Sequence, residues 1–156
     1  MRSPEELTNL FRANRLKVTP QRVAVFEALH NDHGHPTAEI VWDRVREAMP
    51  TVSLRTVYQV LNDLVAMDEV RLVSLGNGAS RFDSNLSGHH HFVCRVCERV
   101  YDVASSQPSM ITDPNRNVAP IQKTGIDSAT HVQESAVHRV EATQIIFRGP
   151  CASCAK

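Results

Sequence analysis

The sequence predicts an α+β protein with two domains: a helical N-terminal domain that ends in a β-hairpin, and a smaller α/β domain closed by cysteines. Apolar residues recur at helical spacing as far as Met67, and alternating, strand-like segments follow. All four cysteines fall in the second half, as two Cys-x-x-Cys pairs. Between the two patterns lies a short stretch of small polar residues, which is typical of a hinge. We therefore place the first domain at residues 1–83, the hinge at 84–88 and the second domain at 89–156.

Four helices are predicted from their start signals. The first opens at Pro4, and the others follow the N-cap residues Thr19, Thr37 and Ser53, with the last helix running to about residue 67. Trp42 lies near the apolar stripe of the third helix, where we expect its indole to belong to the core. The residues expected to face inward are, helix by helix, Leu7, Leu10 and Phe11; Val23, Val25, Phe26, Ala28 and Leu29; Ile40, Val41, Val45 and Met49; and Val57, Val60, Leu61 and Leu64.

Strands are predicted after the helices. Residues 70–75 and 80–83 form a hairpin around a glycine-rich turn at 76–78, and four helices followed by a hairpin indicate a winged helix-turn-helix. In the second domain, residues 91–94 and 99–102 read as short strands, and 140–147 as a final strand. Prolines and a glycine interrupt residues 104–137, for which the pattern predicts no long helix.

Charge and hydropathy narrow the class of protein. The chain of 156 residues carries 17 basic and 17 acidic residues, so net charge does not indicate nucleic-acid binding. Hydrophobic residues make up 42%, enough for a core, and no apolar run approaches the length of a membrane span. The N-terminal residues lack the apolar stretch of a secretory signal. These features predict a cytoplasmic protein without a membrane segment.

The distribution of charge is more informative than its sum. Arg12, Arg15, Lys17 and Arg22 lie in a stretch without acids, which could face phosphates or be an ordinary solvated surface. The outer face of the fourth helix presents Arg, Thr, Tyr and Gln near its N-terminus, and an exposed helix would more often carry Glu/Lys pairs. Such side chains reach phosphates and base edges in a major groove, which makes these positions candidates for DNA contacts: Arg55, Thr56, Tyr58 and Gln59.

The cysteines indicate a metal site. Cys94-x-x-Cys97 and Cys151-x-x-Cys154 each offer two sulfurs from one tight turn, as structural zinc sites require. A disulfide framework does not suit a reducing compartment, and a redox motif is not expected in two copies without a thioredoxin-like pattern. We therefore predict Zn²⁺ bound by four thiolates, which ties the start of the second domain to its end and contributes folding free energy.

A second set of candidate ligands surrounds the hinge. His89 and His91 share one face of a strand while His90 points away, and two carboxylates, Asp83 and Asp102, are available nearby. His35 precedes the third helix; alone it reads as an exposed polar residue, but with the others it could complete a site. Three imidazoles and two carboxylates suit Fe, Mn or Zn and offer too little thiolate for Cu(I).

Several motifs together resemble the ferric uptake regulator (Fur) family. The resemblance covers roughly residues 5–103 continuously and resumes at about 138–154. It is carried by Val18-Thr19-Pro20-Gln21-Arg22, His35-Pro36-Thr37-Ala38, Ser53-Leu54-Arg55-Thr56-Val57-Tyr58, Ser80-Arg81-Phe82-Asp83 and His89-His90-His91-Phe92-Val93-Cys94-Arg95-Val96-Cys97.

The resemblance implies a homodimeric transcriptional repressor with an N-terminal winged helix and a C-terminal dimerisation domain. It implies a palindromic double-stranded DNA operator as partner, contacted by Arg55 and Tyr58 together with neighbouring Thr56. Phosphates would meet the basic edge formed by Arg15, Lys17 and Arg22. The four cysteines would hold structural Zn²⁺, and regulatory Fe²⁺ or Mn²⁺ would be bound by His35, Asp83, His89, His91 and Asp102.

The two carboxylates suggest a branch within that family. Iron-uptake regulators typically carry Glu at these two positions, and Asp at both resembles the peroxide-sensing, PerR-like branch. A shorter carboxylate changes the coordination of the metal and the room left for peroxide. In that branch, peroxide and ferrous iron oxidise a ligand histidine, here His89 or His35, and the DNA is released. The alternative is an iron- or zinc-uptake regulator of the same family.

Two other classes of protein remain as alternatives. A non-haem metalloenzyme could use the same His/Asp ligands, but the sequence indicates no separate base or nucleophile, so we do not expect an enzyme. A zinc-ribbon interaction module without DNA binding would not need the outer face of residues 55–59. Metal-dependent binding to palindromic DNA, compared with substrate turnover, separates these classes.

Overall fold

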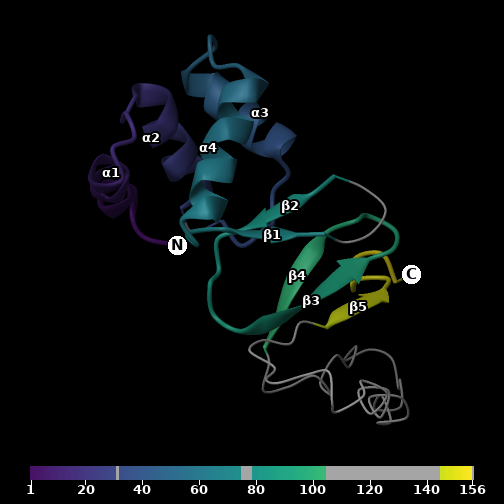
Figure 1. Cartoon of the computed structure of the whole chain (residues 1–156). Coiled ribbons are helices and arrows are strands. Elements are labelled where there is room, and N and C mark those ends of the chain that lie inside the picture. Colours follow the sequence, from purple (N-terminus) through teal and green to yellow (C-terminus); the bar gives the residue numbers. More distant parts are fainter. Residues whose placement is uncertain (31, 75–78, 105–144, 156) are drawn as a thin grey trace, which may run out of the picture. The chain divides into compact units, whose positions relative to one another are not determined.

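The computed structural model describes residues 1–30, 32–74, 79–104 and 145–155. The chain divides into two compact units, Met1–Ser87 and Gly88–Lys156, and each is described by itself (Figure 1). Within the described ranges, no helix is both long enough and apolar enough to cross a membrane.

The first unit contains the four predicted helices: α1 (Pro4–Ala13), α2 (Pro20–Leu29), α3 (Ala38–Ala48) and α4 (Leu54–Ala66). The side chains of Thr19, Thr37 and Ser53 each accept a hydrogen bond from the amide three residues on, so all three predicted N-caps are confirmed. The first helix has a capping box, in which Ser3 and Glu6 each accept a hydrogen bond from the other's backbone amide.

The helices enclose the core of the first unit. The rings of Phe11 and Phe26 meet edge to face at 4.8 Å between centroids, and both are fully buried. The prediction for Ile40 is wrong: it is 38% exposed, because α3 turns Val41 and Val45 inward and each helical residue is rotated by about 100° from the last. Val23 is likewise only partly buried. Trp42 packs against the core and its indole N–H donates to a backbone carbonyl, as expected of a core tryptophan.

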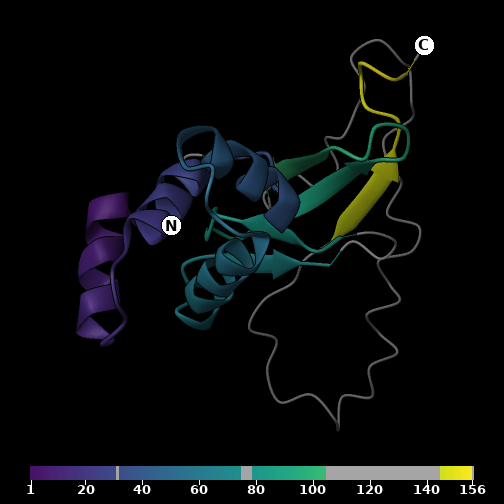
Figure 2. The ribbon, with the colours of Figure 1, turned by 90° about the horizontal axis from the view of Figure 1, so that it is seen from above.

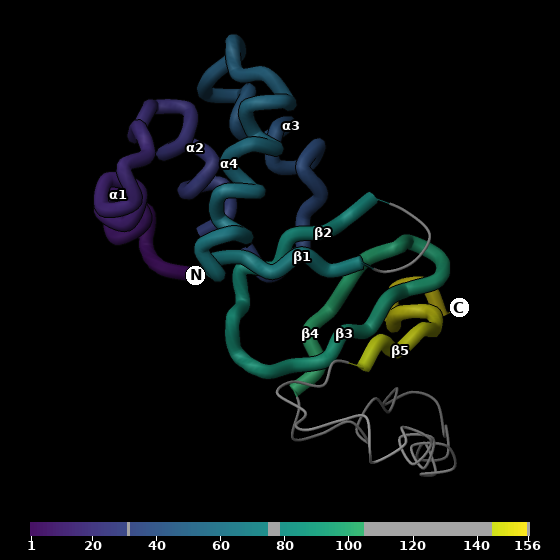
Figure 3. Tube along the Cα trace, in the orientation of Figure 1, coloured from purple at the N-terminus to yellow at the C-terminus, as the bar shows by residue number. Residues whose placement is uncertain are grey.

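Two short antiparallel strands complete the first unit: β1 (Arg71–Val73) and β2 (Arg81–Asp83), with Leu72 opposite Phe82. Both lie within the predicted hairpin, whose turn at 76–78 is outside the described residues. The amide of Phe82 donates to the carbonyl of Pro36 at 2.9 Å, and Thr37 bridges to Arg81. The segment that leads into α3 is therefore held against β2, as the trace in Figure 3 lets the reader follow.

The described residues of the second unit form a three-stranded sheet of β3 (His89–Cys94), β4 (Val100–Ala104) and β5 (Ile146–Gly149), in the order β4-β3-β5. The first pairing is antiparallel and the second parallel, with β5 beside β3 in Figure 2. The last strand runs to Gly149, later than the predicted 140–147, because backbone pairing with Cys94 and Arg95 continues to that residue. Residues 105–144, which include the stretch for which no long helix was predicted, lie outside the described residues.

Candidate metal centres and candidate nucleic-acid interface

The four cysteines of the second unit converge. One ligand atom from each of Cys94, Cys97, Cys151 and Cys154 lies within 4.8 Å of all the others, and the sulfurs of Cys97 and Cys151 are 3.8 Å apart. Four thiolates at about 2.3 Å from a tetrahedral Zn²⁺ lie roughly 3.8 Å from one another. The cysteine set therefore fits zinc, and the prediction that these four residues form one cluster is confirmed.

Backbone amides prepare one of these sulfurs for a metal. The Sγ atom of Cys94 accepts hydrogen bonds from the amides of Val96, Cys97 and Cys151, at 3.4, 3.5 and 3.2 Å. These bonds, led by the one from Cys97, lower the pKa of Cys94 to about 6, against the usual 9.0. Hydrogen bonds to Cys151 and Cys97 raise the pKa of Cys154 to about 12. Without a metal, the Cys94 thiol therefore loses its proton far more readily than the Cys154 thiol. A cation bound by all four sulfurs would remove this difference, because its charge favours deprotonation of every sulfur.

Two residues beside the cysteines were missed by the sequence reasoning. Tyr101 on β4 lies opposite Phe92, and a hydrogen bond to Cys151 raises the pKa of its phenol. The guanidinium of Arg99 is hydrogen-bonded to Tyr101 and lies near two of the sulfurs, and these contacts raise the pKa of Arg99. Such partners orient metal ligands. No motif marks them: Arg99 lies two residues after Cys97, and strand pairing brings Tyr101 to the cysteines.

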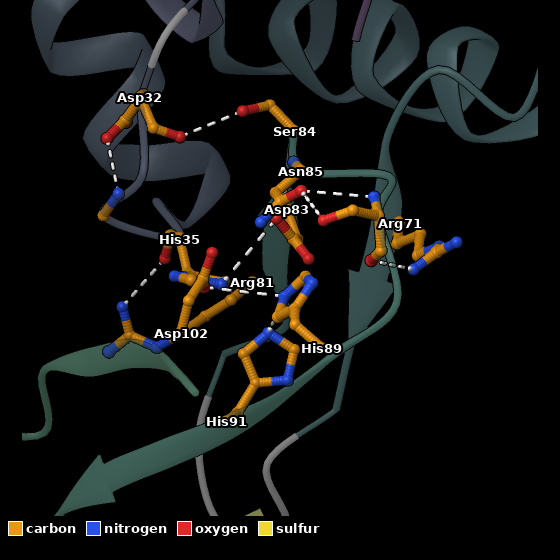
Figure 4. Close-up of polar contacts among 12 residues, drawn as sticks. Asp32, His35, Arg71, Arg81, Asp83, Ser84, Asn85, His89, His91 and Asp102 are labelled. Atoms are coloured by element: carbon orange, nitrogen blue, oxygen red, sulfur yellow. Dashed lines mark hydrogen bonds and ion pairs between the residues drawn. The ribbon is translucent and has the colours of Figure 1, made fainter. Parts of the chain in front are cut away.

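The second unit also holds three of the predicted regulatory ligands. The Nε2 atoms of His89 and His91 lie 3.0 Å apart, and Nε2 of His89 is 3.5 Å from a carboxylate oxygen of Asp102 (Figure 4). His90 points to the other face of β3, where its ring packs against Phe147 at 6.3 Å between centroids. The strand alternation predicted this arrangement, and the register, with His91 opposite Asp102, explains the position of the carboxylate.

The first unit holds the other two predicted ligands. Nε2 of His35 lies 3.7 Å from Oδ1 of Asp83, and both side chains are buried. Asp83 Oδ1 also accepts a hydrogen bond from the amide of Asn85 at 2.8 Å, and Arg81 donates to the carbonyl of His35 at 3.1 Å (Figure 4). The backbone of His35 is left-handed, with φ of 50°, a conformation that costs free energy for a residue with a side chain. Strained backbone of this kind is typical of functional sites.

Both sets of ligands, three residues in the second unit and two in the first, fit a divalent cation by their chemistry. Imidazole nitrogens and carboxylate oxygens are the donors that Fe²⁺, Mn²⁺ and Zn²⁺ share. In the 3.0 Å contact between the Nε2 atoms of His89 and His91, one nitrogen donates and the other accepts, so one of the two presents a lone pair to its neighbour. A cation bound between the two nitrogens could take the place of the proton that they share.

The outer face of α4 carries the residues predicted to contact DNA. Arg55 and Gln59 are exposed, and Tyr58 is 39% exposed. Thr56 is half-buried, and its hydroxyl lies 2.8 Å from that of Ser53 within the N-cap. The exposed residues in the N-terminal half of α4 are thus Arg55, Tyr58 and Gln59, and Asn62 and Ala66 are exposed further along the helix.

In the basic edge formed by Arg15, Lys17 and Arg22, two side chains are exposed and the third is hydrogen-bonded within the first unit. Arg15 and Lys17 are exposed. Arg22 instead donates to Asp63 on α4 at 2.8 Å and to the carbonyl of Lys17 at 3.0 Å, with its guanidinium over the ring of Phe11. This arginine links α2, α4 and the preceding loop, which the sequence pattern did not indicate.

Comparisons with known proteins agree with this architecture. The family model described as "Ferric uptake regulator family" matches residues 13–136. Two curated relatives, the peroxide-responsive repressors PerR of Staphylococcus epidermidis and of Staphylococcus aureus strain Mu50, are each 32% identical over 98 residues, 63% of this chain. The matched stretch spans only 65% and 66% of those relatives.

Solved structures show the same fold. The Helicobacter pylori ferric uptake regulator Fur has a TM-score of 0.68 at 18% identity, covering 97% of this chain and 91% of that one. The Campylobacter jejuni peroxide stress regulator has a TM-score of 0.62 at 21% identity, covering 99% and 100%. The family model spans most of the sequence and the fold agrees with it. The chain belongs to the ferric uptake regulator family.

Proposed function

We propose that this protein is a metal-dependent, DNA-binding transcriptional repressor that acts as a homodimer on a palindromic operator in the cytoplasm. Family membership supports this proposal, and so do relatives named as repressors. A two-fold symmetric dimer presents two copies of α4, the helix proposed to enter the major groove, so its operator is expected to be palindromic as well.

The regulatory metal is Fe²⁺ or Mn²⁺, held by His35 and Asp83 from the first unit and by His89, His91 and Asp102 from the second. The observation that carries this proposal is the 3.0 Å separation of the His89 and His91 Nε2 atoms on one face of β3. Because the ligands come from both units, the bound metal favours one arrangement of the two winged helices. The metal shifts the equilibrium between the possible arrangements only to the extent that it binds this arrangement more tightly than the others.

DNA is bound through α4 and the basic edge. Arg55 and Tyr58 on the exposed face of α4, with Thr56 beside them, enter the major groove, and Arg15 and Lys17 meet phosphates. Arg22 stabilises the same surface, because it donates hydrogen bonds to the carbonyl of Lys17 and to Asp63 of α4. Phosphate contacts of this kind make the affinity fall with salt concentration.

The signal is hydrogen peroxide. Aspartate at positions 83 and 102 supports this branch of the family, as do relatives named as peroxide-responsive. Ferrous iron, if held by these residues, would supply the redox chemistry through which hydrogen peroxide oxidises a ligand histidine. The ring of His89 or His35 would gain one oxygen atom of the peroxide, the other would leave as water, and the oxidised ring would no longer serve as a ligand, so the DNA-binding arrangement would no longer be favoured.

The test combines metal analysis with DNA binding. Protein purified without oxygen is analysed for zinc and iron, and its binding to a randomised pool of duplexes is measured before and after peroxide. We expect zinc in every preparation and metal-dependent selection of a palindrome. Peroxide should abolish binding only with iron, with one added oxygen on the peptide of His89 or His35.

Other outcomes identify the alternatives. Binding that follows iron or zinc concentration and survives peroxide, with unmodified peptides, indicates a metal-uptake regulator of the same family. Substrate turnover without selection of any duplex indicates a metalloenzyme and contradicts the proposal.

A further inference from the structure

Glu39 of α3 lies on the same exposed surface as α4, the helix proposed to enter the major groove. The hydroxyl of Tyr58, on α4, is 2.7 Å from Oε1 of Glu39, the second residue of α3. Both side chains are exposed to solvent. An acid is unexpected on a surface that meets a polyanion, because it repels phosphates. Its contact with the tyrosine therefore calls for an explanation.

The direction of this hydrogen bond follows from chemistry. An ionised carboxylate can only accept, so the single hydroxyl proton of Tyr58 is donated to Glu39. The hydrogen bond from Tyr58 is the main cause that lowers the pKa of Glu39, and the same bond raises the pKa of Tyr58. Around neutral pH the carboxylate is thus charged and the phenol protonated, which keeps the donor and acceptor roles as stated.

The bond leaves a surface that can accept hydrogen bonds but not donate them. The Tyr58 oxygen retains its lone pairs, whereas the carboxylate of Glu39 is also hydrogen-bonded to the Thr37 side chain and to its own backbone, so the tyrosine oxygen is the acceptor left for DNA. Phosphates, guanine O6 and N7 and thymine O4 are acceptors as well, so none of them can bond to this pair. The only donors on base edges in the major groove are the exocyclic amino groups, adenine N6 and cytosine N4.

We propose that Glu39 is a specificity-determining residue of the DNA interface, which makes Tyr58 a reader of the amino group of adenine or cytosine. The inference rests on the proposed function, since it requires α4 to lie in the major groove. Neighbouring Arg55 offers only donors and is suited to guanine or phosphate. The two side chains therefore read complementary features of the DNA.

The experiment uses the full chain loaded with Zn²⁺ and Mn²⁺ and a pool of randomised duplexes. Wild type is compared with Glu39→Gln, which keeps the shape but adds a donor, and with Tyr58→Phe, which removes only the hydroxyl. Glu47→Gln is the matched control, because Glu47 is an exposed acid near the other end of the same helix. Zinc content and thermal melting verify that each variant is folded.

We expect wild type and Glu47→Gln to require adenine or cytosine at one position of each half-site. Glu39→Gln and Tyr58→Phe should each relax the preference at that position by about fivefold or more, the factor expected of a lost base contact. The double variant should relax it no further, because the two residues act as one unit. Replacing the selected base by an analogue without the amino group should weaken wild type but not the Tyr58→Phe variant.

Unchanged base preference in Glu39→Gln at every position would overturn the inference while leaving the proposed function intact. Equal tolerance of the amino-free analogue by wild type and Tyr58→Phe would do the same. If loaded wild type selects no duplex at all, the proposed function itself fails, and this inference fails with it.

Discussion

The Nε2 atoms of His89 and His91 lie 3.0 Å apart on one face of β3, while the ring of His90 packs on the other face against Phe147. One strand thus separates a candidate metal face from a packing face, residue by residue. This separation makes the three adjacent histidines distinguishable by experiment.

Replacing His89 by alanine should lower the affinity for Mn²⁺ by at least about 100-fold, since loss of mere supporting contacts already costs 10–100-fold. His90→Ala should keep the Mn²⁺ affinity but lower the melting temperature, because it removes a buried ring. Calorimetric titration with Mn²⁺ measures the affinity of each variant, and a melting curve measures its stability. Equal loss of Mn²⁺ binding in both variants would contradict the assignment of faces.

Replacing Cys151 by serine should release zinc and unfold the sheet of the second unit. Cys151 follows β5 closely and its amide donates to Cys94, so the metal would hold β5 against β3. Structural zinc supplies about 10 kcal/mol or more in small domains. Zinc analysis and circular dichroism before and after a chelator measure the effect. Ala152→Ser, an exposed change between the ligands, should retain zinc and the wild-type melting curve.

The chain segment before Gly88 should loosen when Arg71 is removed. The guanidinium of Arg71 donates to the carbonyls of Leu86 and Ser87, at 2.7 and 3.1 Å, and thereby anchors the end of the first unit to β1. Arg71→Ala should speed hydrogen exchange in the peptide containing residues 84–88, and Arg71→Lys should do so less. Arg46→Ala, which removes an exposed pair with Asp43, is the control. Unchanged exchange in Arg71→Ala would show that other contacts suffice.

The left-handed backbone of His35 predicts different effects of two substitutions. Asparagine adopts positive φ far more readily than a β-branched residue, and both replacements lose the imidazole. His35→Val should therefore be less stable than His35→Asn by about 1–2 kcal/mol. Urea unfolding of the two variants measures this difference directly. Equal stability would indicate that the strain is relieved by a local change of backbone.

The titration of Tyr58 should depend on Glu39. In wild type the phenol must give up a proton that it shares with a carboxylate, so its pKa is raised. Glu39→Gln removes the negative charge, and the pKa of Tyr58 should fall back toward its usual 10.0. For Glu39 the sign is opposite: its folded-state pKa is lowered, so its stabilising contribution is present above the unfolded value and is lost on acidification through the folded value. Ring resonances followed by NMR against pH report both.

Much of the fold followed from local patterns. The N-caps at Thr19, Thr37 and Ser53 were predictable because capping depends on residues three positions apart. The inward face of α3 was predicted less well, since apolar character alone placed Ile40 inside. The core has room for Val41 and Val45, and helix rotation leaves Ile40 at the surface.

The candidate metal centres were predictable to a similar degree. The spacing of the cysteines and the alternation of the histidines named the ligands, because close neighbours in sequence share a turn or a strand face. The residues that support them were not predictable: Tyr101 reaches Cys151 only through strand pairing. The same is true of Arg22, whose partner Asp63 lies on another helix.

By itself, then, the sequence determined the helices, the family and the four-cysteine ligand set, all of which depend on short-range spacing. Only the tertiary structure decided what those residues contact. It brought Glu39 to Tyr58, opposed His91 to Asp102 and gave His35 its left-handed backbone. Such contacts join residues from different elements, and their free energy depends on distances that no local pattern encodes.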